Sequence, residues 1–233
     1  MSKKNLGLYI HIPFCRSKCA YCDFYSLPDC REYQRYVDSL LLHMEDYSAT
    51  VKEYDINTVF IGGGTPSVLP QKCVISLING IYSNFNVTTD AEFTMEVNPA
   101  TVSYGNLRAY HDMGVNRLSI GMQSACDNEL RALTRIHNFE QFEECYKFAR
   151  RAKFDNINVD LMYGIPEQTP ATLRMSLETL TDLDPEHISL YGLMIEDNTP
   201  FAEVRDKLPL PNEDEEYQMY ADSIDFLLSQ GYC

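Results

Sequence analysis

Residues 57–82 read NTVFIGGGTPSVLPQKCVISLINGIY. The run Asn57–Ile61 is short and rich in residues that favour strands, and three glycines follow it directly. Apolar residues then recur over Gln71–Tyr82 at the spacing of an amphipathic helix. The stretch therefore predicts a strand, a turn of open backbone and a helix.

Similar strand–helix units occur along the whole chain. Strands are predicted at Leu6–Ile12, Asn57–Ile61, Glu92–Val97, Arg117–Gly121, Asn158–Met162 and His187–Leu193. Helices are predicted at Arg31–Ala49, Gln71–Tyr82, Tyr104–Met113, Asp127–Leu133, Phe139–Arg151, Ala171–Leu183 and Glu213–Ser229. Strands that alternate with helices indicate a parallel sheet, and six units fall short of the eight of a closed barrel. We expect an α/β fold, a partial (β/α)6 barrel whose parallel sheet is open and carries outer helices.

The chain is long enough for a sizeable core, with 233 residues of which 45% are hydrophobic. It has 34 acidic against 19 basic residues, a formal charge of -15. This balance argues against a nucleic-acid partner, which would be bound through Lys and Arg, and solubility explains it simply. No stretch reaches the roughly 18 apolar residues of a membrane span, and the N-terminus lacks the apolar region of a signal peptide. We therefore expect a cytoplasmic protein.

Three of the eight cysteines, Cys15, Cys19 and Cys22, form a CxxxCxxC pattern just after the first predicted strand. Thiolates hold iron–sulfur clusters, and a cubane normally takes four of them. Three closely spaced cysteines therefore predict a [4Fe-4S] cluster with one iron open to S-adenosylmethionine (SAM). A zinc site is the alternative, with His11 or Cys30 as its fourth ligand.

The other cysteines have no ligand spacing, and most are expected to be small buried hydrophobic residues. They are Cys30, Cys73, Cys126, Cys145 and Cys233. The proline-rich stretch Asn198–Asn212 is the best candidate for a flexible connection, but a surface loop before the last helix is the favoured interpretation.

Residues suited to ligand binding follow the predicted strands. They lie in the stretches Gly62–Pro66, Glu96–Pro99, Gly121–Ser124, Arg135–His137 and Asp160–Pro166. The glycines would let a ligand approach the backbone, whose N–H and C=O groups can bind a polar head. In α/β barrels the carboxyl ends of the strands carry the chemistry. Each residue alone could be structural, but together they predict one binding site at the mouth of the barrel.

The individual side chains suggest roles in that site. Glu96 can accept hydrogen bonds from a ribose or an ammonium, and Gln123 offers an amide to a nucleoside hydroxyl. Arg135 could pair with a ligand carboxylate. Asp160 lies inside an apolar strand and therefore needs partners.

Three further side chains have two interpretations each. His11 is either a core histidine or faces the cluster. His187 and Tyr191 either line a cavity or pack.

Together these motifs resemble the family of oxygen-independent coproporphyrinogen III oxidases and their heme-chaperone relatives, within the radical-SAM proteins. The stretches that carry the resemblance are Tyr9–Cys15, Cys15–Cys22, Gly62–Pro66, Glu96–Pro99, Asn116–Gly121, Arg135–His137 and Asp160–Pro166. The resemblance implies SAM contacts at Tyr9, the backbone around Tyr21, Gly63, Gly64, Thr65, Glu96, Gln123, Arg135 and Asp160, with a further contact near Met194.

Two features separate the branches of that family. The oxidase branch looks like CxxxCxxCxC, with a further cysteine two positions after the third ligand, where this chain has Phe24. That branch also has a longer N-terminal extension than the 14 residues that precede Cys15 here. Both differences favour the heme-chaperone branch. That branch implies heme as cargo and acceptor hemoproteins as partners, with transient contact with membrane hemoproteins, and it assigns no electron donor. The alternative is a coproporphyrinogen III oxidase, which would cleave SAM reductively in an oxidative decarboxylation of porphyrin biosynthesis.

Family members usually continue into a smaller C-terminal domain with a histidine-rich segment implicated in heme handling. Residues 1–233 would then be the radical-SAM core domain, and the chain is expected to be a fragment.

Overall fold

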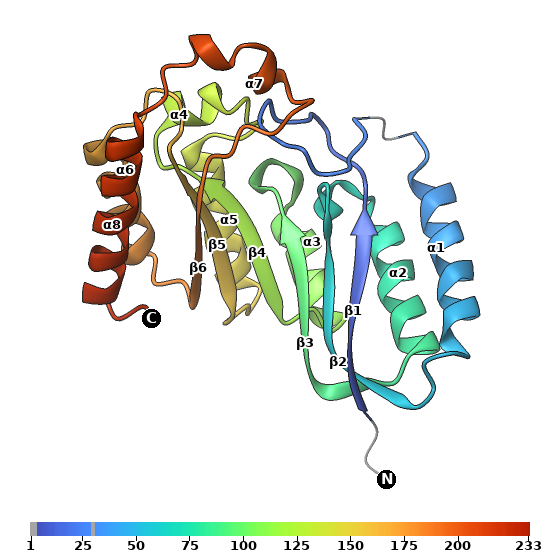
Figure 1. Cartoon of the computed structure of the whole chain (residues 1–233). Coiled ribbons are helices and arrows are strands. Elements are labelled where there is room, and N and C mark those ends of the chain that lie inside the picture. Colours follow the sequence, from blue (N-terminus) through green and yellow to red (C-terminus); the bar gives the residue numbers. More distant parts are fainter. Residues whose placement is uncertain (1–3, 29–30) are drawn as a thin grey trace.

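The computed structural model describes residues 4–28 and 31–233, and its centre is a six-stranded parallel sheet (Figure 1). The strands are β1 Lys4–Ile12, β2 Tyr54–Gly63, β3 Val87–Val97, β4 Arg117–Gln123, β5 Ile157–Tyr163 and β6 His187–Gly192. Their spatial order is that of the sequence, so β1 and β6 are the two edges. All pairs of neighbours are parallel. The expected open, partial barrel is confirmed.

Helices cover the outer face of this sheet (Figure 1). The helices of the chain are α1 Tyr33–Ser48, α2 Gln71–Asn84, α3 Tyr104–Asp112, α4 Asp127–Ala132, α5 Phe139–Arg151, α6 Pro170–Asp182, α7 Pro200–Glu203 and α8 Glu213–Ser229, and of these the short α7 lies over the mouth end of the sheet instead (Figure 1). The predicted strands and long helices are all present, and α5 and α8 have the predicted bounds. The short elements were missed, because single turns carry no periodic signal: α7 and the 3-10 turns Pro66–Val68, Pro99–Thr101 and Arg205–Lys207.

The two faces of the sheet differ in chemistry because side chains alternate along a strand. The face toward the helices is apolar and buried, with Ile10, Ile12, Val59, Ile61, Phe93, Met95, Leu118, Ile120, Val159 and Leu161 in one core with the helices. Burying one such side chain contributes about 1.5–3 kcal/mol. The inner face instead carries polar groups, among them Thr94, Ser119 and Asn158, all buried. Packing of the helices on the outer face thus stabilises the sheet, and its inner face is available for polar contacts.

The helices behind the sheet begin at side-chain caps. Ser103, Asn138, Thr169 and Asn212 each accept a hydrogen bond from the amide three residues later, in a reciprocal capping box. Such a cap is worth about 1 kcal/mol. The caps fix where α3, α5, α6 and α8 start, and therefore how the preceding loops run across the mouth of the sheet.

The stretch 198–212 is not a flexible connection. It folds into α7 and a 3-10 turn, and Phe201 is buried with Leu133, Met162 and Ile165 in a second, small core. The backbone amide of Phe201 also donates to the carbonyl of Ala20, 3.0 Å away. The segment therefore packs on the cysteine loop, which a proline-rich composition did not predict.

Cys73 and Cys145 are buried as expected, whereas Cys126 is partly exposed and Cys233 is exposed. Cys30 lies outside the described residues. Within the described ranges, no helix has the length and apolar character needed to cross a membrane.

Candidate functional site

The three predicted ligand cysteines lie in one loop after β1. Cys15 is buried, and Cys19 and Cys22 are partly exposed. The loop is closed on itself, because the amide of Cys15 donates to the carbonyl of Leu27 at 3.1 Å and the amide of Cys22 to that of Cys19 at 3.1 Å. The backbone thus holds the three thiols on one short, ordered segment at the mouth of the half-barrel.

The surroundings of the thiols suit a negatively charged cluster. An Arg135 Nη1 proton points to the Cys19 Sγ at 3.8 Å, and the Thr65 hydroxyl donates to the Cys15 Sγ at 3.4 Å. Burial raises the pKa of the Cys22 thiol, and the neighbouring Cys19 and Cys15 raise it further. The thiols are therefore close enough to influence one another, with a guanidinium beside them. Three thiols with a cation fit the chemistry of a thiolate-bound cluster.

A single zinc ion fits this loop less well. Within residues 4–28 and 31–233, no three His, Cys, Asp or Glu side chains are arranged to hold one metal ion. His11 is also engaged: its Nδ1 meets the Tyr9 hydroxyl at 2.9 Å and its Nε2 meets the Tyr25 carbonyl at 3.0 Å. Cys30, the other proposed fourth ligand, lies outside the described residues.

The glycine turn after β2 is a place of close approach. Gly63 has φ +115°, and a Cβ there would lie 2.5 Å from the His11 ring. The amide of Gly63 donates to Glu96 Oε2 at 3.0 Å, and the amides of Gly64 and Thr65 donate to the carbonyls of Ile12 and Phe14. These three amides therefore already donate to acceptors within the protein. A ligand at this turn would meet carbonyl oxygens, which suit an ammonium better than an anion.

Two carboxyl groups face the inside of the sheet. Burial raises the pKa of Glu96 to about 7, against the lowering effect of the Gly63 amide, and the nearby Asp160 raises it further. Burial also raises the pKa of Asp160, although Tyr191, Asn158 and Ser119 hydrogen-bond to it and lower it. Asp160 therefore has the partners that its place in an apolar strand requires.

Two buried polar atoms at the mouth have no hydrogen-bond partner, namely Gln123 Oε1 and Arg135 Nε. Gln123 ends β4 in a left-handed conformation, with φ 69°, that turns it away from regular strand geometry. Arg135 is anchored by Nη2, which donates to the carbonyl of Gly121 at 3.0 Å. Buried polar atoms normally find partners, so both point to a polar ligand in this place.

The remaining predicted contacts surround these groups. Tyr9 is 55% exposed, and Glu96 lies close enough to raise its pKa. Tyr21 is hydrogen-bonded to Arg135. Met194 lies just beyond β6 and is 72% exposed. The structure therefore brings together Tyr9, Glu96 and Asp160 on one side and Cys19, Tyr21 and Arg135 on the other.

The structure distinguishes between the two interpretations, lining a cavity or packing, that the sequence left for Tyr191 and His187. Tyr191 hydrogen-bonds to Asp160 and belongs to the inner wall. His187 lies at the opposite end of β6, where its Nδ1 meets Arg117 Nη2 at 3.1 Å. The wall beneath Asp160, formed by Ser119, Asn158 and Ser189, was not predicted. Its only sequence signal is polar residues at alternate positions of strands that otherwise read as apolar.

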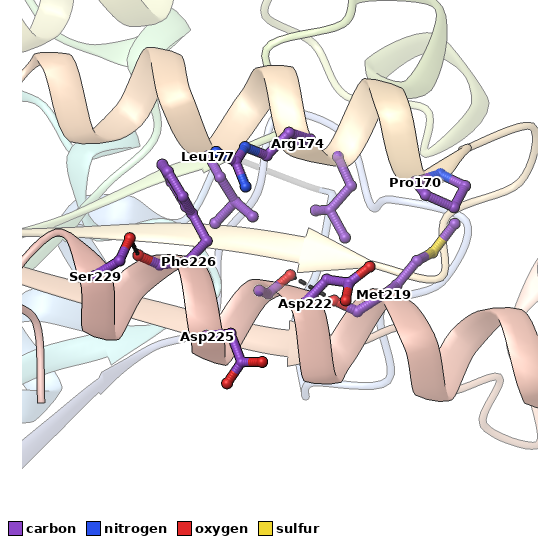
Figure 2. Close-up of a pocket in the computed structure, with 10 residues that line it drawn as sticks. Pro170, Arg174, Leu177, Met219, Asp222, Asp225, Phe226 and Ser229 are labelled. Carbon is purple, nitrogen blue, oxygen red and sulfur yellow. Dashed lines mark hydrogen bonds between the residues drawn. The ribbon is translucent and has the colours of Figure 1, made fainter.

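A further cavity lies away from these residues. A cavity of about 370 Å³ separates α6 from α8, and Figure 2 shows Arg174 beside Phe226 in its wall. The Arg174 guanidinium stacks over the Phe226 ring at 3.9 Å. This cavity is on the helical side of the sheet and contains none of the predicted site residues. The chemistry of the mouth, and not the size of a hollow, locates the candidate site.

Comparison with known proteins gives a consistent picture. The Radical SAM superfamily model matches residues 9–180. A heme chaperone, HemW, of Buchnera aphidicola is 38% identical over 97% of this chain and 60% of its own length. HemW of Escherichia coli is 37% identical over 97% of this chain and 60% of its own length. The chain thus spans about 60% of the length of these relatives.

The fold comparison agrees. Coproporphyrinogen III oxidase (HemN) of Escherichia coli, described as a radical SAM enzyme, superposes with a TM-score of 0.91 at 27% identity. The match covers 100% of this chain and 54% of the oxidase.

Proposed function

The chain belongs to the radical SAM superfamily, and we propose that it binds a [4Fe-4S] cluster through Cys15, Cys19 and Cys22 and SAM beside it. The observation that carries this proposal is that three cysteines of one loop lie at the same mouth as Gln123 Oε1 and Arg135 Nε, two buried polar atoms without a hydrogen-bond partner among the described residues. Residues 1–233 would form the core domain for this chemistry.

The chain's own residues would divide the work of holding SAM. The turn at Gly63 and Gly64 would offer carbonyl oxygens to the ammonium, and Arg135 a guanidinium to the carboxylate. Glu96 and Asp160 would accept hydrogen bonds from hydroxyl groups, and Gln123 would meet the nucleoside. The cluster, when bound, would supply an open iron and one electron. The side chains themselves bind, orient and exclude water.

Anaerobic reconstitution with iron and sulfide tests this proposal. Addition of SAM should change the electron paramagnetic resonance spectrum of the reduced cluster, because SAM would occupy its open iron. Asp160→Ala should weaken SAM binding by about 1.5–3 kcal/mol, the cost of a hydrogen bond to a charged group, while the iron content stays unchanged. Glu92→Gln removes an exposed carboxylate on the same inner face and is the matched control. A spectrum that SAM leaves unchanged would contradict the proposal.

We further propose that heme is the cargo of the whole protein and that acceptor hemoproteins receive it. Two observations support this choice over oxidase activity. The curated relatives at 37–38% identity are heme chaperones. Phe24 occupies the position at which the oxidase pattern has a further cysteine, and it is 72% exposed just after the third ligand cysteine. An oxidase must hold a propionate within about an ångström of the reacting position, which a phenyl ring at this place would obstruct.

The second candidate is a coproporphyrinogen III oxidase, and the TM-score of 0.91 to such an enzyme favours it. Two assays separate the candidates. Incubation of the full-length protein with reductant, SAM and coproporphyrinogen III, followed by chromatography, should give no protoporphyrinogen. The same protein should take up heme and transfer it to an apo-hemoprotein. Sustained turnover would replace the chaperone proposal with the oxidase one.

A further inference from the structure

The inner wall below the mouth holds a connected set of polar side chains from three strands. They are Ser119 of β4, Asn158 and Asp160 of β5, and Ser189 and Tyr191 of β6. Residues two apart on a strand share a face, and Asp160 pairs with Ser189 in the register of the sheet. The alternation of side chains and the register of the strands therefore place the whole set on one face of the sheet.

The hydrogen bonds of this set converge on the carboxyl group of Asp160. Asn158 Nδ2 donates to Asp160 Oδ1 at 2.6 Å and to the Ser119 hydroxyl at 2.8 Å. The Ser119 hydroxyl in turn lies 3.2 Å from Asp160 Oδ1 and 3.4 Å from Oδ2, and donates to the carboxyl group. Two donors on the same carboxyl group restrict its rotation about the last torsion angle.

Asn158 is itself fixed from behind. The Ser189 hydroxyl donates to Asn158 Oδ1 at 2.9 Å, and the Asn158 side chain is buried. Both ends of the amide are thus in use. The orientation is set by chemistry, since a carboxylate accepts and only the NH₂ end of the amide can donate to it.

A further hydrogen bond reaches the carboxyl group from Tyr191 of β6, which is 45% exposed and also hydrogen-bonds to Ser189. A side chain that served packing alone would need none of these directed bonds, and an apolar residue would fill the space at lower cost.

We propose that Asn158 is a positioning residue that holds the Asp160 carboxyl group in the orientation required at the SAM site. The inference rests on the proposed function, because it assigns Asp160 to SAM. Asn158 does not touch the ligand and acts only through Asp160, as a partner of a ligand-contacting group does.

Two substitutions at this position distinguish positioning from packing. Asn158→Asp has the same shape but places a second carboxyl oxygen against Asp160 Oδ1, at the 2.6 Å that the amide now spans. Two carboxylates this close share one proton. When the new acid holds that proton, its O–H donates to Asp160 as the amide did. Asn158→Leu cannot donate at any pH.

The measurement is the SAM dissociation constant of the reconstituted protein, by calorimetry at pH 6 and pH 8.5, with each variant compared with wild type at the same pH. Both variants should bind at least about tenfold more weakly at pH 8.5. Asn158→Asp should recover most of its affinity at pH 6, whereas Asn158→Leu should not. Glu96, Arg135 and Tyr191, the other groups that face Asp160, are the same in all three proteins, so the ratio to wild type removes their titration.

Controls separate the possible failures. Thr94→Val removes a buried inner-face hydroxyl that contacts Glu92 and Arg117 but not Asp160, and it should leave the affinity unchanged. Iron content should be equal in all variants. If wild type shows neither SAM binding nor a spectral change, the proposed function fails. If wild type binds but both variants bind equally well, or the loss in Asn158→Asp does not depend on pH, the positioning role is refuted.

A milder variant keeps the test valid if the substitutions at 158 prevent folding. Ser189→Ala removes the bond that holds Asn158 Oδ1, together with the hydrogen bond between Ser189 and Tyr191, and leaves Asp160 with its direct donors. It should weaken SAM binding by about fivefold, the effect of one neutral hydrogen bond, with a smaller SAM-induced spectral change. Unchanged affinity in this folded variant would overturn the proposal.

Discussion

Glu96→Gln should make the cofactor-free chain more stable at alkaline pH than the wild type. Burial raises the pKa of Glu96 from 4.5 to about 7. Between these two values the folded chain keeps a proton that the unfolded chain has lost, so the free energy of unfolding falls as the pH rises. At about 1.36 kcal/mol per pKa unit, the full penalty above pH 7 is about 3.4 kcal/mol. Glutamine has the same shape, still accepts from the Gly63 amide and never ionises.

Urea denaturation of wild type and variant at pH 5 and pH 8.5, with thiols kept reduced, measures this difference. The two proteins should be similar at pH 5, where Glu96 is protonated. At pH 8.5 the variant should be more stable by about 1–3 kcal/mol, since water and local rearrangement reduce the full penalty. The variant should also bind SAM more weakly, because it has lost a charge that the site is proposed to use.

Glu92→Gln is the matched control. Its side chain is 49% exposed on the same face of β3, so removal of this charge should have a small effect at both pH values. If the stability of Glu96→Gln runs parallel to that of wild type from pH 5 to pH 8.5, Glu96 is not held protonated in the free chain. The reasoning from burial would then be wrong.

Three further predictions concern the cysteine loop and its supports. Cys19→Ala should reduce iron and sulfide after reconstitution to background, whereas Cys126→Ala, outside the loop, should retain both; full iron content in Cys19→Ala would contradict the ligand assignment. Phe201→Ala should lower the free energy of unfolding in urea by about 3 kcal/mol and speed hydrogen exchange at Ala20, because it empties the small core under the loop; unchanged exchange would show that α7 does not brace it. Gly63→Ala should lower the melting temperature by forcing a side chain into a left-handed conformation against His11; an unchanged melting temperature would refute this reading of the turn.

The sequence predicted the sheet and its outer helices because both have strong periodic signals. The strands β1 to β6 are apolar runs that end at punctuating residues such as Gly62–Gly64, and α5 and α8 carry regular apolar spacing after a cap. The same logic failed at α7. Its one turn is held by burial of Phe201 and by the bond to Ala20, contacts far away in sequence that no local pattern records.

The sequence also predicted some features of the candidate site and missed others. Residues that follow the strands, such as Glu96 and Gln123, were predicted because a polar group at a strand end is conspicuous. The conformation of Gln123 and the commitment of the Gly63 amide to Glu96 were not, since both depend on how neighbouring strands are aligned. Spacing can identify which residues approach a ligand, but only packing decides which of their atoms remain available.

The inner wall explains why this sheet can hold a polar ligand at all. A closed barrel of eight strands fills its interior with branched apolar side chains. Here six strands leave β1 and β6 unpaired with each other, and the interior is lined by groups such as Ser119, Asn158 and Asp160. Polar groups in such a place are costly unless they bond to one another or to a ligand. The lower wall satisfies its groups internally, whereas at the mouth Gln123 Oε1 and Arg135 Nε remain without partners. These two unsatisfied atoms lie at the end of the sheet where the thiols are, and a ligand bound there would give them partners and so stabilise the fold.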